Sequence, residues 1–410
     1  MTQGGCRFCN APLEHVFADL GMSPLANSYV EPERVGQGEA FYPLRALVCS
    51  RCLLVQLEEF ESPAAIFTDY AYFSSYSSSW VDHARRYVET TIERFGLTGE
   101  HHVVELASND GYLLRWFRDA GIPVLGVEPA ENVAAVAREA GIPTRSVFFG
   151  QETARELLAE APADLLLGNN VLAHVPDLND FVAGMKILLK PGGIITMEFP
   201  HLLQMIAEDQ FDTIYHEHFS YFSFLVVRKV FAQHGLRLWD VQELPTHGGS
   251  LRIFGCHEDD GARPDTDRVG ALLERERAAG LERLETYEDY DRRVKEGKIE
   301  ILEFLIDLKR RGKTIAGYGA PAKGNTLLNY CGIDRGMVEF TVDRNPYKQG
   351  RYLPGTRIPI DAPQRIFDAR PDVVLILPWN LRDEIMAELA GIREWGGAFA
   401  ARAPQLTLFE

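Results

Sequence analysis

The sequence predicts an α/β protein with two doubly wound parallel sheets, preceded by a small cysteine-bearing module. Between residues 101 and 200, short apolar strands alternate with amphipathic helices, and a second series of this kind starts after residue 311. Four cysteines in two CxxC pairs stand before the first series. Because alternating strands and helices fold into parallel sheets covered by helices, each series predicts a sheet of its own.

The composition is that of an ordinary globular protein. Hydrophobic residues make up 46% of the 410 residues and charged residues 25%, enough apolar mass for two or three domains. The net charge of -17 argues against binding to nucleic acids or anionic membranes, because both attract basic surfaces. The chain shows neither a signal peptide nor an apolar run of transmembrane length, so we expect a cytoplasmic protein. We also expect it to be a monomer.

Changes in pattern divide the chain into four parts. We expect a zinc-binding module over residues 1–66 and an α/β domain over 67–256. A charged helical segment, 257–310, is expected to be a solvated connector. The second α/β domain, with a Rossmann-like pattern, covers 311–410.

The two CxxC pairs predict a metal site. In a cytoplasmic protein, cysteines are expected to be thiols or metal ligands rather than disulfides. A CxxC turn can hold two thiolates about 3.5–4 Å apart, which suits tetrahedral Zn²⁺ better than the alternative of redox or incidental cysteines. Four thiolates leave no open coordination position, so we expect a structural zinc ion. The predicted ligands are Cys6, Cys9, Cys49 and Cys52.

The turn after the first strand of the first sheet, ELASNDG (105–111), is typical of a nucleoside site. Its small residues Ala107, Ser108 and Gly111 permit close approach of a ligand to the backbone. The second strand ends in Glu128, which is placed to accept hydrogen bonds from two ribose hydroxyls. The sequence lacks the GxxxxGK[ST] pattern of a phosphate-binding loop.

The stretch DTIYHEHFSYFS (212–223) concentrates titratable and aromatic side chains. His216 and His218 are two positions apart, so they diverge on a helix, and on a strand they lack an evident third metal ligand. A histidine is most often structural, and we expect this of His216. Beside a carboxylate and aromatic rings, however, a partly buried imidazole can acquire the near-neutral pKa that a general base requires. The stretch therefore predicts an acid–base cluster rather than a metal site.

Three fragments, in order and suitably spaced, resemble class I S-adenosylmethionine methyltransferases. ELASNDG resembles their E/D-x-G-x-G-x-G motif, with Ala107 and Asn109 in place of two glycines. NNVLAHVPD (169–177) resembles a later motif, and LKPGG (189–193) the loop before their fifth strand. The resemblance implies S-adenosylmethionine as the cofactor. The implied cofactor-binding residues are Glu105, Ala107, Ser108, Asn109, Gly111, Glu128, Pro129, Asn169 and Asn170.

Over essentially its whole length, the sequence resembles the S-adenosylmethionine-dependent C-methyltransferases that act on nucleotide-linked deoxysugars. The resemblance rests on CRFC…CSRC, DYAYFSSYSSSW, ELASNDG, NNVLAHVPD, YHEHFSYFS, THGGSLR and GYGAPAKGNTLLN. It implies methylation of a ring carbon beside the ketone of a nucleotide-linked 4-keto-deoxysugar in antibiotic biosynthesis. We expect C-3 and a dTDP carrier, although the resemblance leaves C-5 open and nothing in the sequence selects thymidine over uridine. Removal of the α-proton gives an enolate, which needs a base, an oxyanion donor and an in-line methyl group.

The resemblance also implies roles in catalysis. His218 is expected to remove the α-proton, with Glu217 orienting or tuning it. Tyr215 and His174 are expected to donate hydrogen bonds to the enolate oxygen.

The Ser/Tyr-rich loop before residue 80 either packs against a neighbouring domain or closes over the ligand. In the second case we expect Tyr76 to contact the sugar, with Tyr70 and Tyr72 as alternatives.

The turn GYGAPAKGN (317–325) predicts an anion site in the second sheet. Pro321 suits a first helical turn, and Lys323 lies beside the helix N-terminus, where a pyrophosphate can bind. Asp343 could meet a ribose and Lys348 a phosphate, although the segment around them also reads as a plain turn. THGGSLR (246–252) is expected to face the cleft between the domains. The predicted substrate-binding residues are His247, Ser250, Arg252, Gly319, Lys323, Asn325, Asp343 and Lys348.

Three other functions compete with this one. An NAD-dependent sugar oxidoreductase would use GYGAPAKG as its dinucleotide turn, but the full glycine fingerprint and a suitably placed Tyr-x-x-x-Lys pair are missing. A zinc-ribbon binding protein with a degenerate enzyme domain fits poorly with the acidic charge and the YHEH cluster. An O- or N-methyltransferase acting on a nucleotide-sugar would need only modest base catalysis.

Overall fold

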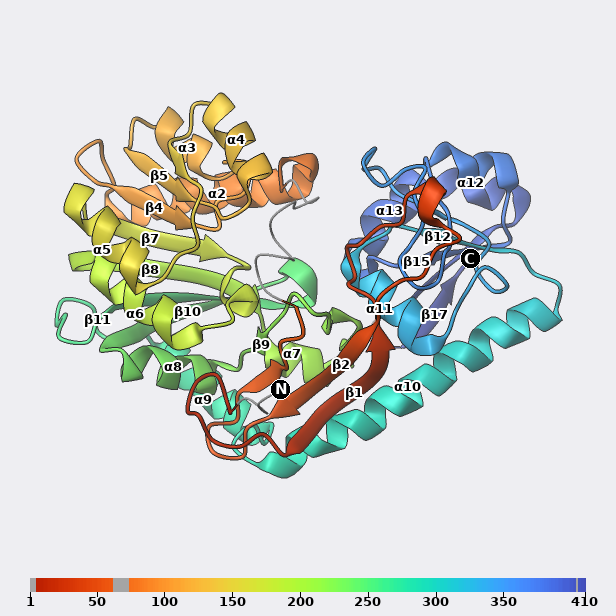
Figure 1. Ribbon diagram of the computed structural model, residues 1–410, viewed down its shortest axis with the longest axis horizontal. Coiled ribbons are helices and arrows are strands. Elements are labelled where there is room, and N and C mark those ends of the chain that lie inside the picture. The colour runs from red at the N-terminus through yellow and green to blue at the C-terminus, as the bar shows by residue number, and fades with distance from the viewer. Residues whose placement is uncertain (1–4, 62–73, 403–404) are drawn as a thin grey trace.

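The computed structural model describes residues 5–61, 74–402 and 405–410. Figure 1 shows two α/β lobes side by side, with the N-terminal strands and the long helix α10 running below and between them. Both doubly wound sheets predicted from the sequence are present.

A four-stranded antiparallel sheet forms the N-terminal module, in the order β1-β2-β3-β9. Its strands are β1 (His15–Ser23), β2 (Tyr42–Val48), β3 (Val55–Leu57) and β9 (Ser220–Tyr221). The last strand comes from the stretch that holds the YHEH residues, and it pairs Tyr221 with Val55 and Ser220 with Gln56. Strand pairing therefore attaches the predicted acid–base cluster to the cysteine-bearing module.

The first lobe contains a seven-stranded sheet in the order β10-β11-β8-β7-β4-β5-β6. The strands from β8 to β6 are parallel, and β11 and β10 add an antiparallel edge. The strands are β4 (Val103–Leu106), β5 (Val124–Val127), β6 (Thr144–Arg145), β7 (Ala163–Asn169), β8 (Leu189–Pro200), β10 (Leu236–Leu244) and β11 (Ser250–His257). The helices are α2 (Ser78–Phe95), α3 (Leu114–Asp119), α4 (Glu131–Glu139), α5 (Gln151–Glu160), α6 (Leu178–Leu188), α7 (Leu202–Ala207) and α8 (Phe224–Gln233).

Short 3-10 turns carry several of the residues near the ends of these strands. They are η1 (Pro32–Arg34), η2 (Ser74–Tyr76), η3 (Leu172–His174), η4 (Phe211–Thr213) and η5 (Thr246–Gly248).

The LKPGG segment, which resembles the loop before the fifth strand, follows α6 directly. Helix α6 stops at Leu188, and β8 begins at once and includes this segment. Pro191 lacks an N–H and disfavours helical geometry at the residue before it, and Gly192 has a φ of 76°.

The segment between the lobes is less solvated than the expected connector. It contains α9 (Asp267–Ala278) and α10 (Leu284–Arg310). The 27 residues of α10 span about 40 Å, and one face of it is buried at helical spacing. The ring of Tyr290 on this face stacks on Phe17 of β1, with centroids 4.5 Å apart. Helix α10 therefore fixes the N-terminal sheet in place as well as connecting the lobes.

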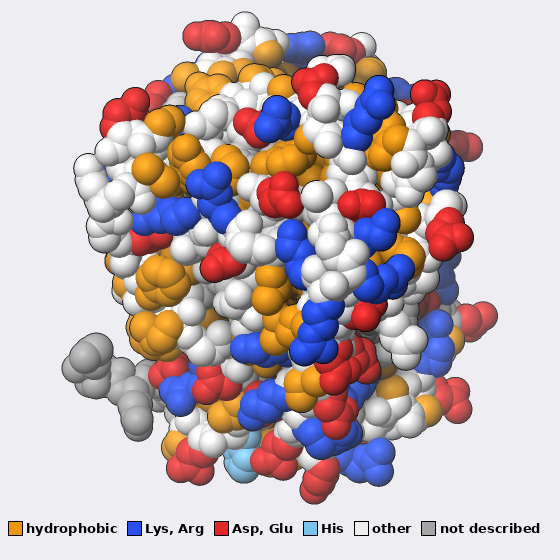
Figure 2. Space-filling view, turned by 90° about the vertical axis from the view of Figure 1, so that its right-hand side faces the viewer, with side chains coloured by type: hydrophobic (Ala, Val, Ile, Leu, Met, Phe, Trp, Pro, Cys, Tyr) orange, Lys and Arg blue, Asp and Glu red, His pale blue; other side chains and the backbone are white. Residues whose placement is uncertain are grey.

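The second lobe contains a six-stranded sheet in the order β14-β13-β12-β15-β16-β17, parallel except for β17. The strands are β12 (Ile315–Tyr318), β13 (Thr341–Val342), β14 (Ile360–Asp361), β15 (Val373–Ile376), β16 (Ala398–Arg402) and β17 (Leu406–Phe409). The helices are α11 (Ala322–Cys331), α12 (Gln364–Ala369), α13 (Arg382–Glu388), η6 (Trp379–Leu381) and η7 (Ala390–Trp395). Acidic and basic side chains are interspersed on the face in Figure 2, as is typical of a solvent-exposed surface.

Among the helices of the described residues, none is long and apolar enough to cross a membrane.

Candidate active site and zinc centre

The four predicted metal ligands converge in the N-terminal module. Their sulfur atoms all lie within 4.8 Å of one another. Cys6 and Cys52, from different CxxC pairs, have sulfurs 3.5 Å apart, and Cys9 and Cys49 repeat this distance. Tetrahedral Zn²⁺ with four thiolates requires sulfur separations of about 3.8 Å, so the cluster fits the ion. Four thiolates leave no position for a substrate, and the zinc is therefore structural.

The turn after β4 has an unusual backbone. Ala107, Asn109 and Gly111 all have positive φ, at 55°, 50° and 76°. A Cβ atom added to Gly111 would lie 2.9 Å from Cγ1 of Ile142, so this position favours glycine for space as well as conformation. Because every second residue of the turn has a left-handed conformation, the backbone is tightly coiled and lies at the end of β4.

Buried carboxyl groups line this turn. Glu105 is fully buried, and neither of its carboxylate oxygens has a hydrogen-bond partner among the described residues. Burial, and then the charges of Glu128 and Asp110, raise the pKa of Glu105 well above its usual value. An unpartnered buried carboxyl group is costly unless a ligand supplies donors or positive charge. The turn is therefore suited to a cationic ligand.

Glu128 follows β5 directly and is held by backbone donors. Its Oε2 accepts from the N–H of Asn109 and its Oε1 from the N–H of Ala130, both at 2.9 Å. Burial raises its pKa, and these two bonds oppose the shift. Its remaining lone pairs can accept ribose hydroxyls, as the sequence suggested.

The other predicted cofactor residues surround the same space. Ser108 is buried, and its hydroxyl has no partner among the described residues. Pro129 lies between Glu128 and the start of α4. At the end of β7, Asn169 Nδ2 and Asn170 Oδ1 are buried without partners in the described part of the chain. Asn170 Nδ2 donates to Nε2 of His247 at 2.9 Å, which joins this edge to the predicted substrate region.

Three rings of the predicted catalytic cluster lie together. The ring centroid of His218 is 4.0 Å from that of Tyr215 and 4.7 Å from that of His174. The Nδ1–H of His218 donates to the carbonyl oxygen of Thr213 at 3.0 Å, which leaves the lone pair on Nε2. Burial and the neighbouring His174 hold the pKa of His218 well below its usual value, so the ring is neutral. This differs from the near-neutral pKa expected from the sequence, because Nδ1 bonds a backbone carbonyl instead of a carboxylate.

Glu217 does not share a hydrogen bond with His218, whose Nδ1 is bonded to Thr213. Instead, its Oε1 accepts from Nδ2 of Asn27 at 2.6 Å. The side chain is 5% exposed, and burial raises its pKa to about 7, opposed by the Asn27 bond. His174 is also buried, and its pKa falls to about 4 although the backbone of Glu217 opposes the shift.

His216 points away from this cluster. Its Nε2–H donates to the carbonyl of Pro43 in β2 at 3.1 Å, and its ring meets the edge of Tyr42. This matches the structural role that the sequence suggested for it.

The Ser/Tyr loop is attached to the cofactor turn. The N–H of Ser74 donates to Oδ1 of Asn109 at 2.8 Å, and that of Ser75 to Oδ2 of Asp110 at 3.1 Å. Tyr76 is 60% exposed in this conformation. The alternatives Tyr70 and Tyr72 lie outside the described residues.

Two of the residues expected to face the cleft are used inside the first lobe. Arg252 donates to Oε2 of Glu198 at 2.6 Å, and its guanidinium lies 4.4 Å from the ring of Tyr87. Ser250 donates to the carbonyl of Thr246 at 2.9 Å. Both belong to β11, and strand pairing with β8 brings Arg252 opposite the buried Glu198.

Sequence reasoning missed Glu198, His83 and Trp80. The Nε2–H of His83 donates to Glu198 at 3.0 Å. Burial would raise the pKa of Glu198, but His83 and Arg252 lower it to about 2. Trp80 stacks on His83 and meets His247 edge-on, with centroids 5.0 and 5.1 Å apart. The tryptophan in the first turn of α2 is the signal in the sequence that points to this group of residues.

Lys323 lies close to the acid–base cluster, and not in a phosphate site separate from it. Its Nζ donates to Oδ1 of Asn380 at 2.8 Å and lies 4.3 Å from the ring centre of Trp379. Trp379 in turn donates to Oδ2 of Asp212 at 2.7 Å. Burial lowers the pKa of Lys323 to about 8, with Asp212 opposing, and its charge lowers the pKa of His218. Asp212 and Trp379 were not among the predicted residues, because their contact crosses the two lobes.

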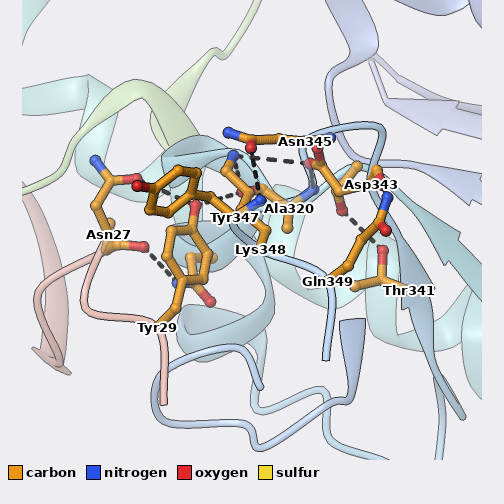
Figure 3. Close-up of polar contacts among 12 residues, drawn as sticks. Asn27, Tyr29, Ala320, Thr341, Asp343, Asn345, Tyr347, Lys348 and Gln349 are labelled. Carbon is orange, nitrogen blue, oxygen red and sulfur yellow. Dashed lines mark hydrogen bonds and ion pairs between the residues drawn. The ribbon is translucent and has the colours of Figure 1, made fainter. Parts of the chain in front are cut away.

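The predicted ribose and phosphate residues meet at the backbone of Ala320 (Figure 3). Asp343 accepts from the N–H of Ala320 at 2.7 Å, and Lys348 Nζ donates to the carbonyl of Ala320 at 2.9 Å. Nζ of Lys348 is 3.7 Å from Oδ2 of Asp343. Gly319, the residue before Ala320, has a φ of 88°. Asn325 differs, since its Nδ2 donates to the carbonyl of Ala26 in the N-terminal module at 2.6 Å.

Comparison with protein families matches the chain in three consecutive parts. Residues 6–67 match the family described as "Putative zinc binding domain", and residues 80–241 match "Methyltransferase domain". Residues 245–404 match "C-methyltransferase C-terminal domain".

One relative matches nearly the whole chain. It is the C-methyltransferase NovU of Streptomyces niveus, 38% identical over 403 residues, or 98% of this chain and 95% of the relative. A ubiquinone biosynthesis O-methyltransferase of Pseudomonas aeruginosa is 33% identical over 107 residues, only 25% of this chain and 44% of that protein.

Likeness to solved structures is more distant. A S-adenosylmethionine-dependent methyltransferase from Mesorhizobium loti has a TM-score of 0.34 and 16% identity, covering 43% of this chain and 99% of that chain. The CcbJ methyltransferase from Streptomyces caelestis has a TM-score of 0.35 and 15% identity, covering 42% and 89%. Scores this low support no argument about function.

Proposed function

Because the chain belongs to the C-methyltransferase family and uses S-adenosylmethionine, we propose that it methylates a nucleotide-linked 4-keto-deoxysugar at the ring carbon beside the ketone. The observation that carries this proposal is the state of His218. Its Nδ1–H is committed to Thr213, so Nε2 offers a lone pair inside a buried cluster of rings. A carbon acceptor needs such a base, because its proton must be removed before the carbon becomes a nucleophile.

The residues of the cluster divide the work of enolisation. His218 takes the α-proton on Nε2, while the C–H electron pair moves into the ring and negative charge develops on the ketone oxygen. Tyr215, whose ring lies 4.0 Å from that of His218, donates a hydrogen bond to that oxygen, whereas His174, neutral and bonded to the backbone of Glu217, packs against the base. Lys323 adds positive charge on the same side of the site and holds the anionic part of the substrate.

The buried turn after β4 holds the cofactor. The fit rests on the unpartnered carboxyl group of Glu105 and the polar atoms of Ser108 and Asn169, which require a ligand with positive charge and hydrogen-bonding groups. S-adenosylmethionine supplies an electrophilic methyl group and carries its charge on sulfonium and ammonium groups. Glu128 holds the ribose hydroxyls.

The nucleotide end of the substrate belongs to the second lobe. Asp343, Lys348 and the turn at Gly319 are proposed to contact the ribose and phosphates. The dTDP carrier, methylation at C-3 and a place in antibiotic sugar biosynthesis rest on the family resemblance. Action in the cytoplasm rests on the sequence pattern, and action as a monomer is a further part of the proposal.

The function is tested by supplying labelled S-adenosylmethionine with a panel of nucleotide-linked 4-keto-deoxysugars and analysing the products by mass spectrometry. We expect one sugar to gain a methyl group on carbon. Failure of every keto sugar to accept the label would contradict the sugar assignment.

Exchange of the α-proton separates carbon methylation from O- or N-methylation. In D₂O without cofactor, the enzyme is expected to wash deuterium into the carbon beside the ketone. His218→Asn should abolish exchange and turnover while cofactor binding survives. The matched control is His216→Asn, which changes a neighbouring histidine bonded to Pro43 and should retain turnover. Retained exchange in His218→Asn would remove this residue as the base.

A further inference from the structure

A segment of the N-terminal module reaches the catalytic cluster. After β1 ends at Ser23, residues 24–30 run between the YHEH stretch and the second lobe. Within this segment, Nδ2 of Asn27 donates to Oε1 of Glu217 at 2.6 Å. This is shorter than the range of about 2.7–3.2 Å that is usual for an N–H hydrogen bond to oxygen. The two residues are 190 positions apart in sequence.

Tyr29 fixes which way the Asn27 amide faces. The Tyr29 hydroxyl donates to the carbonyl of Ala320 at 2.6 Å and lies 3.2 Å from Oδ1 of Asn27, which shares the same hydrogen. Burial raises the pKa of Tyr29, so the hydroxyl keeps its proton. Because Oδ1 is turned toward this donor, the NH₂ end of the amide must face Glu217.

The far end of this chain of contacts lies on the predicted nucleotide residues. The carbonyl of Ala320 also accepts from Lys348, and its N–H donates to Asp343 (Figure 3). The segment is further anchored by backbone hydrogen bonds between Val30 and Tyr352, both at 2.9 Å. Contacts therefore run from the second lobe, through the N-terminal module, to a carboxyl group of the catalytic stretch.

We propose that Asn27 is a positioning residue that orients the Glu217 carboxyl group beside the base, and that Tyr29 locks this amide to the second lobe. The inference rests on the proposed function, in which His218 removes the α-proton, together with the expectation from the sequence that Glu217, its neighbour in the chain, tunes that base. It assigns the N-terminal module a part in catalysis in addition to its zinc-dependent fold.

The physical effect of the Asn27 bond is to favour the charged form of Glu217. Burial alone disfavours that form, and the amide N–H opposes burial. The groups that act on Glu217 are the Asn27 amide and the Tyr29 hydroxyl, with the His174 ring against its backbone; Lys348 and Asp343 act on Tyr29. Loss of the amide should therefore move the protonation of Glu217 to higher pH, by about one unit.

The test compares the pH dependence of turnover and α-proton exchange in wild type, Asn27→Ala and Ser28→Ala. Ser28 is exposed in the same segment and serves as the control. We expect Ser28→Ala to match wild type. In Asn27→Ala, kcat at pH 7 should fall about fivefold and the acidic limb of the pH profile should move up by about one pH unit, with unchanged cofactor affinity and thermal midpoint. If the acidic limb of Asn27→Ala lies at the same pH as that of wild type, the proposal is overturned.

Two further variants keep the test decisive. Tyr29→Phe retains the ring but frees the amide to turn, so the limb should shift in the same direction by a smaller amount. It stands in for Asn27→Ala should that variant fold poorly, and an unmoved limb in Tyr29→Phe counts against the proposal. Combining Asn27→Ala with Glu217→Gln should slow exchange no more than Glu217→Gln alone, whereas additive losses would contradict an action through Glu217.

Different results would contradict the proposed function and the positioning role of Asn27. A wild-type enzyme that exchanges no α-proton in any keto sugar contradicts the proposed function. Normal exchange in wild type with an unmoved limb in both variants contradicts only the positioning role.

Discussion

The turn after β4 and the turn after β12 occupy the same place in their two sheets, yet opposite charges surround them. Each follows a central parallel strand and precedes a helix. Around the first turn, Glu105 and Glu128 are buried carboxyl groups with raised pKa values. Beside the second turn lie the ammonium groups of Lys323 and Lys348.

This difference shows what topology determines and what side chains determine. The doubly wound sheet provides a crevice at the carboxyl ends of its strands, whichever ligand occupies it. The sign of the buried charges then selects between a cationic ligand at the first turn and an anionic one at the second. A chain with both turns can bring a sulfonium donor and a phosphorylated acceptor to one cluster of histidines.

The largest expected effect follows removal of the charge from the first turn. Glu105→Gln should weaken binding of S-adenosylmethionine about 10- to 100-fold, since a hydrogen bond to a charged group contributes about 1.5–3 kcal/mol. Isothermal titration calorimetry measures this, with the exposed Glu100→Gln as control. An unchanged Kd would mean that Glu105 serves the ligand as a neutral acid, and the contrast between the turns would weaken.

The second turn should respond to the opposite change. Lys323→Met keeps the length of the side chain but removes its charge, so affinity for the nucleotide-sugar should fall about tenfold while that for the cofactor stays the same. The control is Lys313→Met, which removes a half-exposed lysine paired with Asp372 ahead of β12. Equal loss of affinity for both ligands would show that Lys323 supports the fold of the site rather than the anion.

The two ligands should depend on pH in opposite directions. Lys323 has a pKa lowered to about 8 by burial, so it loses its charge as pH rises through 8 and nucleotide affinity falls. Glu105 has a raised pKa, so its carboxylate forms only as pH rises, and cofactor affinity increases. Binding titrations between pH 6 and about 9 test both slopes. Lys323→Arg, which stays charged, should lose the alkaline fall, and a persistent fall would assign it to another group.

The last prediction concerns the backbone of the two turns and stability rather than ligand affinity. Gly319→Ala should lower the free energy of unfolding by about 1–3 kcal/mol, because φ is positive and the new Cβ would lie 2.5 Å from Cδ of Pro378. Gly111→Ala should cost less, since its neighbour is the side chain of Ile142. Gly312→Ala has a positive φ and open space, so it isolates the backbone contribution in thermal unfolding. The reverse order would mean that the second turn adapts more easily than the first.

Local pattern predicted much of the molecule. Strand and helix alternation gave both sheets, the CxxC spacing gave the four sulfurs, and YHEH gave a real cluster of rings. The contact of Asn27 with Glu217 and that of Trp379 with Asp212 were missed, because each joins segments that only tertiary packing brings together. The sequence analysis expected Arg252 to face the cleft. Its buried partner Glu198 lies on β8, and the sequence does not reveal that β8 pairs with β11.

Strand β9 makes the N-terminal sheet depend on the order of synthesis. Strands β1 to β3 and all four cysteines leave the ribosome early, but the strand that covers the edge of β3 follows only after most of the first lobe. Until then, β3 presents unpaired backbone groups, which are a template for association with other chains. Chains that stop before Ser220 should therefore bind zinc yet aggregate through this edge, and the YHEH stretch acts as the closing piece of the sheet.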